Sequence, residues 1–542
     1  MIDRQLPKRL EVLIVWILCI MTGSAHAYLA NYNKRGLYVK SIDDVRALSD
    51  HEIDLATAAL IVSEQWSDVV HGLRYRSKLD DMAQEIKNRL RERSLRADHR
   101  AIPVINEYLF EELGFKAVSE PNDPNDLFLH SVIDNREGYC LSLSILYLSI
   151  GERLGLPLHG VVVPGHFFVR YQSSSQQFNI ETTAKGVSLS DEHYMTEHNV
   201  PKGSTHRLYM KSLDKKQTLG CLFNNFGVVY LETGLPKLAI LALDTSARIN
   251  PMLSEARSNL GIVLMQEGHA EDALVQLKYA LEINPNDAAV RRELGRAYLR
   301  TKKYRQAVEE LTRSIEIDPN GVEPYILLAE VYSLREQYRL AREALETALL
   351  RHADNARLNA ALARISQKNR NYERALLYYR RALDLKPDLL EAHFGTAICN
   401  QELGRSDQEI GAYKNMLRIA PNSYDASFNL AQAYARQDMF DMAQQYYLRA
   451  IEINPSDAIA HCNLAISYSK TSQTEQAISH FNKAIALDTK MGVAHHNIAV
   501  AYYNKGKYRD AWHHIQKAHQ LGVDVSQEVL DAVAERAGVA IP

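Results

Sequence analysis

The sequence predicts two kinds of structure in one chain: a small α+β module near the N-terminus, followed by an all-α solenoid of helical hairpins, so that the chain is mostly α. Three observations lead to this prediction. Small residues, alanines and prolines each recur at a constant interval through the second half of the chain. Residues 41–135 place apolar side chains at helical spacing. Residues 160–183 change to short β-rich runs.

The composition restricts the classes of partner. The chain has 542 residues, 46% of them hydrophobic, which is enough for several packed cores. Its formal net charge is −3, and it has neither a polybasic run of the kind that binds nucleic acid nor an acidic tail. We therefore expect no nucleic-acid partner, and no motif implies a metal or an organic cofactor.

Residues 1–27 are typical of a signal peptide. Three basic residues precede the apolar run "LEVLIVWILCIM", and "SAHA" ends it with Ala25 and Ala27 at the small-residue positions of a cleavage site. The apolar run is shorter than the roughly 20 residues of a comfortable membrane span. We expect cleavage after Ala27, with an uncleaved anchor as the alternative. The mature chain is then exported without a membrane span, to the periplasm if the source is a Gram-negative bacterium.

Residues 28–210 are expected to form the α+β module, with a helical N-terminal part. The run "CLSLSILYLSIGERLGLP" is apolar over four turns, which predicts a buried helix from Cys140 to about Gly155. The runs "GVVVPG", "HFFVRY" and "FNIETT" predict short strands, and "SSSQQ" predicts the hairpin loop between the last two. A helix in front of a small antiparallel sheet is an α+β arrangement.

Three side chains of this module have the chemistry of a thiol catalyst. Cys140 is predicted at a helix N-terminus, where unpaired N–H groups favour a thiolate and can hold an oxyanion. His166 is predicted to open a strand, from which it can take the thiol proton and later protonate a leaving amine. Glu181, expected on the partner strand of the hairpin, can orient the imidazole and stabilise its cation.

The run from "EIDLATAAL" through "RLGLPLHGVVVPGHFFVRY" to "NIETTAKG" resembles the transglutaminase-like superfamily, in particular a bacterial branch often found beside tetratricopeptide repeats. The resemblance covers about residues 45–200 and implies a papain-like fold. In that superfamily a helix-start cysteine, a strand histidine and an acidic residue form the catalytic triad, and Cys140, His166 and Glu181 match these positions. The resemblance therefore implies a cysteine hydrolase or acyltransferase that acts on amide or peptide bonds.

Two alternatives remain open at this point. The third position of the triad is usually aspartate in the superfamily, and Asn179 competes with Glu181 as the residue that orients the imidazole, because alternation puts both on one strand face. The superfamily also has non-catalytic members. The alternative function is thus a scaffold or assembly protein in which the α+β module is degenerate.

The second half of the chain has a strict internal period. Prolines end successive segments, and alanines recur at a fixed distance before these positions, with Glu409 as the one exception in that series. A further set of positions is uniformly small. The prolines are Pro251, Pro285, Pro319, Pro387, Pro421 and Pro455, and the small positions are Gly227, Gly261, Gly295, Ala329, Ala363, Ala397, Ala431, Ala465 and Ala499.

The interval between these positions resembles that of the tetratricopeptide repeat (TPR), whose period is about 34 residues. Small residues allow the two helices of a hairpin to approach closely, and proline ends the second helix. We predict nine repeats over residues 217–523 and a capping helix within residues 524–542.

The first helices of the repeats are expected to line a groove that binds a polypeptide partner or substrate. Its predicted lining includes a series of asparagines, namely Asn225, Asn259, Asn429, Asn463 and Asn497. His495, His496, His513 and His514 lack the spacing of a metal site and are interpreted as surface residues.

The cysteines of the mature chain are expected to remain free thiols. Cys221, Cys399 and Cys462 lie on separate predicted repeats, beyond the roughly 7 Å limit between Cα atoms that a disulfide can bridge. Only Cys140 is assigned a chemical role.

Overall fold

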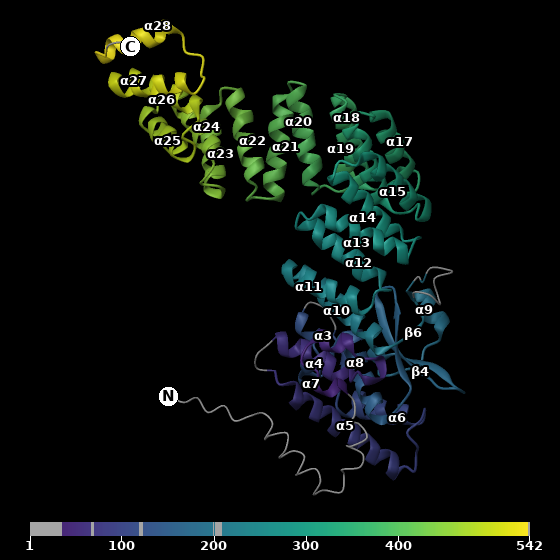
Figure 1. Ribbon diagram of the computed structural model, residues 1–542. Coiled ribbons are helices and arrows are strands. Elements are labelled where there is room, and N and C mark those ends of the chain that lie inside the picture. The colour runs from purple at the N-terminus through teal and green to yellow at the C-terminus, as the bar shows by residue number, and fades with distance from the viewer. Residues whose placement is uncertain (1–34, 67–69, 119–122, 199, 201–208, 540–542) are drawn as a thin grey trace, which may run out of the picture. The chain divides into compact units, whose positions relative to one another are not determined.

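The computed structural model describes residues 35–66, 70–118, 123–198, 200 and 209–539 (Figure 1). The described chain forms two compact units, which divide after Ile317. The predicted fold class is confirmed, since an α+β region is followed by paired helices. The predicted signal peptide, residues 1–27, lies outside the described residues, so export stays a prediction, as do the domain limits given above.

The first unit begins with helices that surround a small sheet. Its α-helices are α3 (Ile42–Ala47), α4 (Leu55–Trp66), α5 (Gly72–Glu92), α6 (Ala101–Asn106), α7 (Leu129–Asn135), α8 (Cys140–Leu154) and α9 (Asp191–Glu197). The 3-10 turns are η1 (Arg35–Tyr38), η2 (Asp50–Glu52), η4 (Pro124–Leu127) and η5 (Thr182–Ala184), and η3 (Glu107–Glu112) is a π-helical turn.

Four strands form an antiparallel sheet in the order β5-β4-β3-β6. They are β3 (Leu158–Val163), β4 (His166–Gln172), β5 (Gln177–Ile180) and β6 (Ser212–Leu213). A second, parallel pair joins β1 (Lys116–Ala117) to β2 (Glu137–Gly138). The predicted strands and the hairpin loop between β4 and β5 are therefore confirmed.

Helix α8 is the centre of the first unit. It is buried over nearly its whole length and packs against β4, α5 and α7. The two faces of β4 have different neighbours because alternate side chains point to opposite sides. Phe167, Val169 and Tyr171 belong to the core that contains α8, whereas Phe168 belongs to a separate cluster with Tyr194 of α9.

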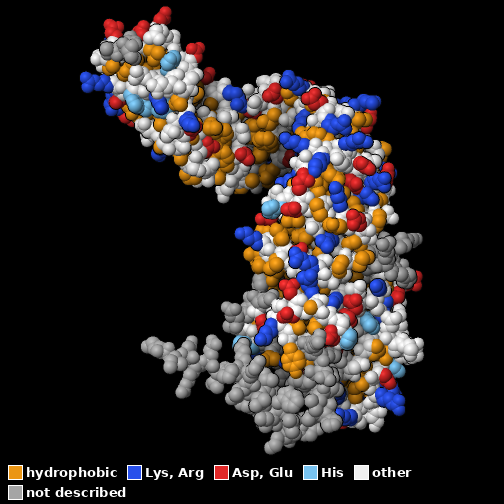
Figure 2. Space-filling view, in the orientation of Figure 1, with side chains coloured by type: hydrophobic (Ala, Val, Ile, Leu, Met, Phe, Trp, Pro, Cys, Tyr) orange, Lys and Arg blue, Asp and Glu red, His pale blue; other side chains and the backbone are white. Residues whose placement is uncertain are grey.

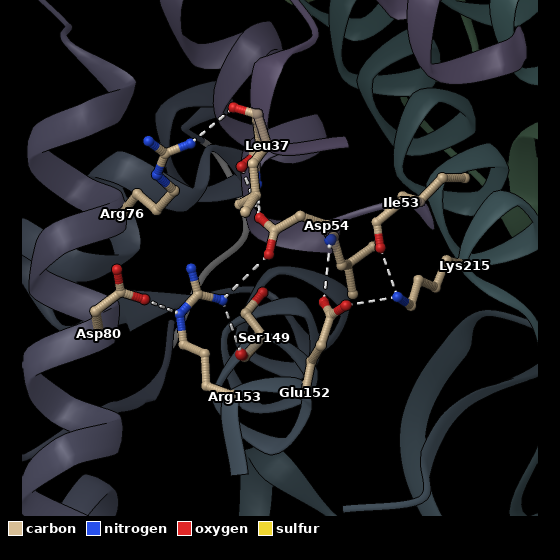
Figure 3. Close-up of polar contacts among 11 residues, drawn as sticks. Leu37, Ile53, Asp54, Arg76, Asp80, Ser149, Glu152, Arg153 and Lys215 are labelled. Atoms are coloured by element: carbon tan, nitrogen blue, oxygen red, sulfur yellow. Dashed lines mark hydrogen bonds and ion pairs between the residues drawn. The ribbon is translucent and has the colours of Figure 1, made fainter. Parts of the chain in front are cut away.

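The C-terminal end of α8 is held by a buried polar network (Figure 3). Arg153 donates to Asp80 Oδ1 at 2.6 Å and lies 3.8 Å from Asp54 Oδ2. Glu152 accepts from Lys215 Nζ at 2.5 Å, and the same ammonium donates to the main-chain oxygen of Ile53. Lys215 is the first residue of the first repeat helix, so these contacts join the repeats to the α+β region.

The repeat helices form nine consecutive pairs between residues 215 and 520, followed by one more helix. In the first unit they are α10 (Lys215–Glu232), α11 (Pro236–Ile249), α12 (Ser254–Gln266), α13 (Ala270–Ile283), α14 (Ala288–Arg300) and α15 (Tyr304–Ile317). In the second unit they are α16 (Val322–Leu334), α17 (Tyr338–Leu349), α18 (Ala356–Lys368), α19 (Tyr372–Leu385), α20 (Leu390–Glu402), α21 (Ser406–Ile419), α22 (Tyr424–Arg436), α23 (Phe440–Ile453), α24 (Ala458–Lys470), α25 (Thr474–Leu487), α26 (Gly492–Asn504) and α27 (Tyr508–Gln520), with α28 (Gln527–Ala537) last.

The small positions of the period lie where paired helices touch. A Cβ atom added at Gly227 would come within 2.3 Å of Leu243, which lies on the second helix of the same hairpin. Gly261 and Gly295 would clash with Leu277 and Leu311 in the same way. The sequence period is therefore the record of a repeated close contact between two helices.

Glu409, which interrupts the alanine series, is buried and forms an ion pair with Arg436 of the next first helix. Burial raises the pKa of Glu409, and the guanidinium opposes that effect. The glutamate that stands here in place of alanine is therefore compensated by a positive charge from the neighbouring repeat.

Two histidine pairs lie between helices of the repeats, and one of them corrects the interpretation of His495 and His514 as surface groups, whereas His513 is exposed as expected. His495 is buried, and its Nδ1 lies 2.9 Å from Nδ1 of His514. One repeat earlier, His461 and His480 form the same contact at 3.0 Å. His461 Nε2 donates to the main-chain oxygen of Pro455. Within a neutral pair, the Nδ1 of His461 is then the acceptor, and His480 donates. The repeat period carries this pair from one hairpin to the next.

These pairs make the stability of the second unit sensitive to acid. Burial lowers the pKa of His480 and of His514 to about 4, with smaller effects of nearby Lys483 and of the partner rings. Unfolding returns both rings to a pKa near 6.5, so the unfolded chain binds more protons between pH 6.5 and 4, and stability falls as the pH falls through this range. We expect a loss on the order of 2 kcal/mol per pair.

Urea unfolding of the full chain at pH 7 and pH 4.5 measures this loss. A protein with His480→Asn and His514→Asn is expected to lose less stability on acidification than the wild type. His513→Asn, which changes an exposed neighbour of His514, is expected to behave as the wild type. Equal acid sensitivity of all three proteins would contradict the assignment.

Candidate active site

Cys140 is the first residue of α8, as predicted from the sequence. Tyr139 precedes it in an extended conformation and supplies no side-chain cap to the helix. Gly138 is required here, because a Cβ atom would meet Ser142 Oγ at 2.8 Å and Val132 at 2.9 Å. The thiol is half-buried at the start of an otherwise buried helix, where main-chain N–H groups are directed outward along the helix axis.

His166 opens β4 directly after the Pro164–Gly165 turn, in which Gly165 has a φ of +72°. Its Nε2 lies 2.8 Å from Oε2 of Glu181, and Cys140 is close enough to raise, together with Glu181, the pKa of the ring. Because Nε2 faces the carboxylate, Nδ1 is the ring nitrogen left for the thiol. The structure thus brings the three predicted residues together, with the imidazole in the middle.

Glu181 differs slightly from its predicted position. It follows the last residue of β5, pairs with Val187 in an isolated bridge and caps η5 through its side chain. One carboxylate oxygen accepts from the main-chain N–H and the hydroxyl of Thr183, and the other accepts from His166 and from Tyr194 at 2.8 Å. With 4% of its surface exposed, this carboxylate is buried but has four donors.

The pKa values of His166 and Glu181 are shifted in opposite directions. Burial alone lowers the pKa of His166, but the hydrogen bonds to Cys140 and Glu181 outweigh it and raise the pKa to about 10. Burial alone raises the pKa of Glu181, and the contacts with His166 and Thr183 reverse the direction, so its pKa is lowered. The pair is therefore an imidazolium and a carboxylate at neutral pH.

Asn179, the competing residue for orienting the imidazole, is used elsewhere. Its Oδ1 accepts from Arg170 Nε at 2.8 Å, and its Nδ2 donates to Asp191 and to the main-chain oxygen of Leu189. All hydrogen-bonding groups of this buried amide thus serve a network with α9. Strand alternation could not separate Asn179 from Glu181, because both side chains point to the same face.

Two residues of α9 and its C-terminal end complete the surroundings of the imidazole and were missed at the level of sequence. Tyr194 donates to Glu181, and the ring of His198 stacks on His166 with 4.8 Å between centroids and 4° between planes. Their spacing of one helical turn puts them on one face of a helix. That spacing was the available signal, but nothing in it indicates which strand this face meets.

Comparison with known families extends this description. Residues 73–220 match the family model of the transglutaminase-like superfamily. Models of the tetratricopeptide repeat match residues 264–320, 301–365, 361–424, 424–457 and 446–479. The chain is a transglutaminase-like domain followed by a TPR array. The match to the transglutaminase-like domain ends inside α10, in agreement with the shared core of α10 and the α+β region.

Individual relatives cover only parts of the chain. A UPF0162 protein of Xylella fastidiosa is 33% identical over 117 residues, which are 21% of this chain and 41% of that protein. F-box only protein 21 of mouse is 34% identical over 73 residues, which are 13% of this chain and 12% of that protein. The chain thus spans less than half the length of these curated relatives. Among solved structures, the Pseudomonas aeruginosa protein pilF is 19% identical and covers 40% of this chain and 99% of its own, with a TM-score of 0.34.

The remaining thiols are poor candidates for chemistry, and the prediction of free thiols is confirmed for the described cysteines. Cys221, Cys399 and Cys462 are all buried in repeat helices. Burial raises the pKa of each, to about 11 for Cys399 and Cys462. Cys140 is the half-buried one of the four and the one that raises the pKa of a nearby imidazole.

The asparagines predicted to line the TPR groove all lie on first helices and are half-buried. Asn259 Nδ2 donates to Asn224 Oδ1 at 2.9 Å, and Asn429 Nδ2 donates to the main-chain oxygen of Asp425 at 2.8 Å. These bonds stay within the TPR array, and a role of the five asparagines in binding a peptide stays a prediction.

Two absences characterise the described part of the chain. None of its helices is long and apolar enough to cross a membrane. Within the same residues, no group of three or more His, Cys, Asp or Glu side chains is arranged to hold a metal ion.

Proposed function

We propose that the transglutaminase-like domain is a cysteine hydrolase that cleaves an amide or peptide bond through an acyl-Cys140 intermediate. The observation that carries the proposal is the place of the His166 ring, whose Nε2 meets Glu181 at 2.8 Å and whose pKa is raised by the nearby Cys140. A nucleophile, a base and a group that orients the base is the arrangement on which acyl transfer by thiols depends.

Each residue has one task in the proposed reaction. The Cys140 sulfur, as the thiolate of a thiolate–imidazolium pair, attacks the carbonyl carbon, and the carbonyl π electrons move to its oxygen. The tetrahedral intermediate then breaks its C–N bond, and the leaving amine takes the proton of the His166 imidazolium. Water attacks the resulting thioester with His166 as its base. The C–S bond breaks, which releases the carboxylic acid and regenerates the pair.

The start of α8 supports the negative charge that develops during these steps. The first N–H groups of a helix have no partner within it, and Tyr139 supplies no side-chain cap. Such donors can hold an oxyanion, and losing one donor of this kind costs about 10²–10³ in rate in other acyl-transfer enzymes. A small displacement of the N-terminal end of α8 would therefore slow the proposed reaction.

The TPR array is proposed to bring a polypeptide partner or substrate to this domain. On the face of the molecule in Figure 2, basic and acidic side chains alternate over the repeat helices, and hydrophobic side chains lie between them. This mixed surface suits a polypeptide rather than a ligand of a single charge. Hydrolysis is favoured over cross-linking because water needs no second binding site.

Alkylation of the folded protein with a small electrophile tests the proposal. Cys19, which lies in the predicted signal peptide, is first replaced by serine so that four thiols remain. We expect one thiol per chain to react rapidly at slightly acidic pH, and Cys140→Ala to remove this fast phase. The other three thiols should react only on unfolding, since each is buried with a raised pKa.

A Cys140→Ala protein also serves as a trap, because it should retain an uncleaved partner that the wild type releases. If all four thiols react slowly and the trap retains no more protein than the wild type, the scaffold function replaces the proposal.

A further inference from the structure

Tyr194 lies where its hydroxyl can fix the position of the Glu181 carboxylate. Its hydroxyl donates at 2.8 Å to Oε2, the oxygen that also accepts from His166 Nε2. The Tyr194 ring is 1% exposed and stacks on Phe168 of β4, with 3.8 Å between centroids and 10° between planes. The hydroxyl is therefore held by the packing of its own ring, independently of the carboxylate.

A glutamate in this position needs such control. Its side chain has one more rotatable bond than aspartate, so its carboxylate has more positions available relative to a fixed strand. Thr183 restrains one carboxylate oxygen from the chain side, and Tyr194 restrains the other from α9. Without the second restraint, the oxygen that meets His166 is left with a single donor.

The ring of His166 is confined from the same helix. His198, one turn after Tyr194, stacks on it with the two ring planes nearly parallel. Because burial and the charge of His166 lower the pKa of His198, this second ring is neutral at pH 7, where His166 is charged. It therefore limits tilting of the His166 ring and adds no second positive charge.

We propose that Tyr194 is a positioning residue, whose hydroxyl holds the Glu181 carboxylate so that the His166 ring stays directed at Cys140. The inference rests on the proposed function, since positioning matters only if the imidazole serves the thiol. It assigns the task to α9, a helix that contributes no group to the reacting atoms.

Tyr194→Phe tests the proposal, because phenylalanine keeps the stacked ring and removes the hydroxyl alone. The matched control is Tyr209→Phe, which removes a hydroxyl of the same buried cluster that donates to Glu255 at 2.6 Å and does not touch the three residues. The readout is the titration of His166, followed by NMR of histidine-labelled full-length protein and assigned with His166→Gln. The titratable groups facing the region are Glu181, Cys140 and His198, with Arg170 and Asp191 near Tyr194.

The expected result is a fall of the His166 titration midpoint by about one pH unit in Tyr194→Phe, because a misplaced carboxylate stabilises the imidazolium less well. Alkylation of Cys140 at acidic pH should slow about tenfold in the same variant. Tyr209→Phe should change neither value. Thr183→Ala, which removes the hydroxyl on the other carboxylate oxygen, gives the same readout if Tyr194→Phe does not fold.

An unchanged midpoint in Tyr194→Phe overturns the proposal. A raised midpoint also overturns it, since the hydroxyl would then only draw charge from the carboxylate. If the midpoint falls while the wild type shows no fast thiol, the positioning role stands and the proposed function fails. The two failures are therefore distinguishable.

Discussion

Replacing His166 with glutamine is expected to slow the alkylation of Cys140 at slightly acidic pH by about 100-fold, within the 10²–10⁴ range typical of general base catalysis. The imidazole accepts the proton of the thiol, and Cys140 and Glu181 together raise the pKa of His166 to about 10 against the opposing effect of burial. Glutamine can fill part of the space but cannot take up a proton. The thiol of this variant therefore loses the partner that keeps it reactive.

The control for this experiment is His159→Gln. His159 lies on the neighbouring strand β3, where its Nδ1 is 3.4 Å from the main-chain oxygen of Leu213. It is half-buried like His166 but does not contact the thiol, so its loss should leave the alkylation rate unchanged. Equal slowing in both variants would point to a general loosening of the sheet and would remove His166 from the proposed reaction.

Arg153→Met is expected to reduce the stability of the first unit by about 3–5 kcal/mol, the usual result of removing one partner from a buried ion pair. The guanidinium is 8% exposed, and it faces Asp80 at 2.6 Å and the buried carboxylate of Asp54 (Figure 3). Burial alone raises the pKa of Asp54, and Arg153 is the strongest of the groups that lower it again. Without Arg153 this carboxylate must take up a proton or unfold its surroundings.

Urea unfolding of the full chain, combined with hydrogen exchange of α8 peptides, measures the effect where it arises. The control Arg93→Met breaks an exposed pair with Glu107 and should leave the exchange of α8 unchanged. Adding Asp54→Asn and Asp80→Asn to Arg153→Met should restore part of the loss, since no buried charge is then unpaired. If Arg153→Met exchanges like the wild type, the network of Figure 3 has no structural role.

The effect of this network should reach the candidate site, because Arg153 and Cys140 lie on the same helix. Glu152, next to Arg153, binds Lys215 of the first repeat helix. The ring of Phe226, on that helix, packs against the ring of Phe128 beside α7, with 4.7 Å between centroids and 31° between planes. The helix that carries the thiol is therefore held at its far end by residues of the TPR array.

Most of the fold could be predicted from the sequence because its determinants are short in range. Gly227 is small because Leu243, on the next helix of the chain, occupies the space beside it, and the same contact recurs at Gly261 and Gly295. The histidine pairs could have been predicted in the same way, since the spacing between His461 and His480 recurs between His495 and His514. The interpretation of His495 and His514 as surface groups was wrong because it treated four neighbouring histidines as one cluster instead of comparing two repeats, although His513 is exposed as expected.

The candidate site could be predicted only in part. A cysteine at a helix start and a histidine after a glycine turn follow from local spacing, and the structure has both where expected. The choice between Glu181 and Asn179 did not follow from local spacing. Alternation along a strand does not show which other elements pack on the strand. Asn179 is hydrogen-bonded to Arg170 and Asp191, whereas the turn at η5 directs Glu181 to the imidazole.

The amino-acid sequence alone was sufficient for the order of modules, the repeat and its length, and the cysteine and histidine of the candidate site. Each of these depends on spacings of a few residues or on a contact that recurs with the period. The donors on Glu181, the stacking of His198 and the attachment of α8 to the first repeat became visible only with the folded chain. They join segments brought together by packing of the sheet and helices, and pairwise spacing along a chain does not encode which surfaces meet.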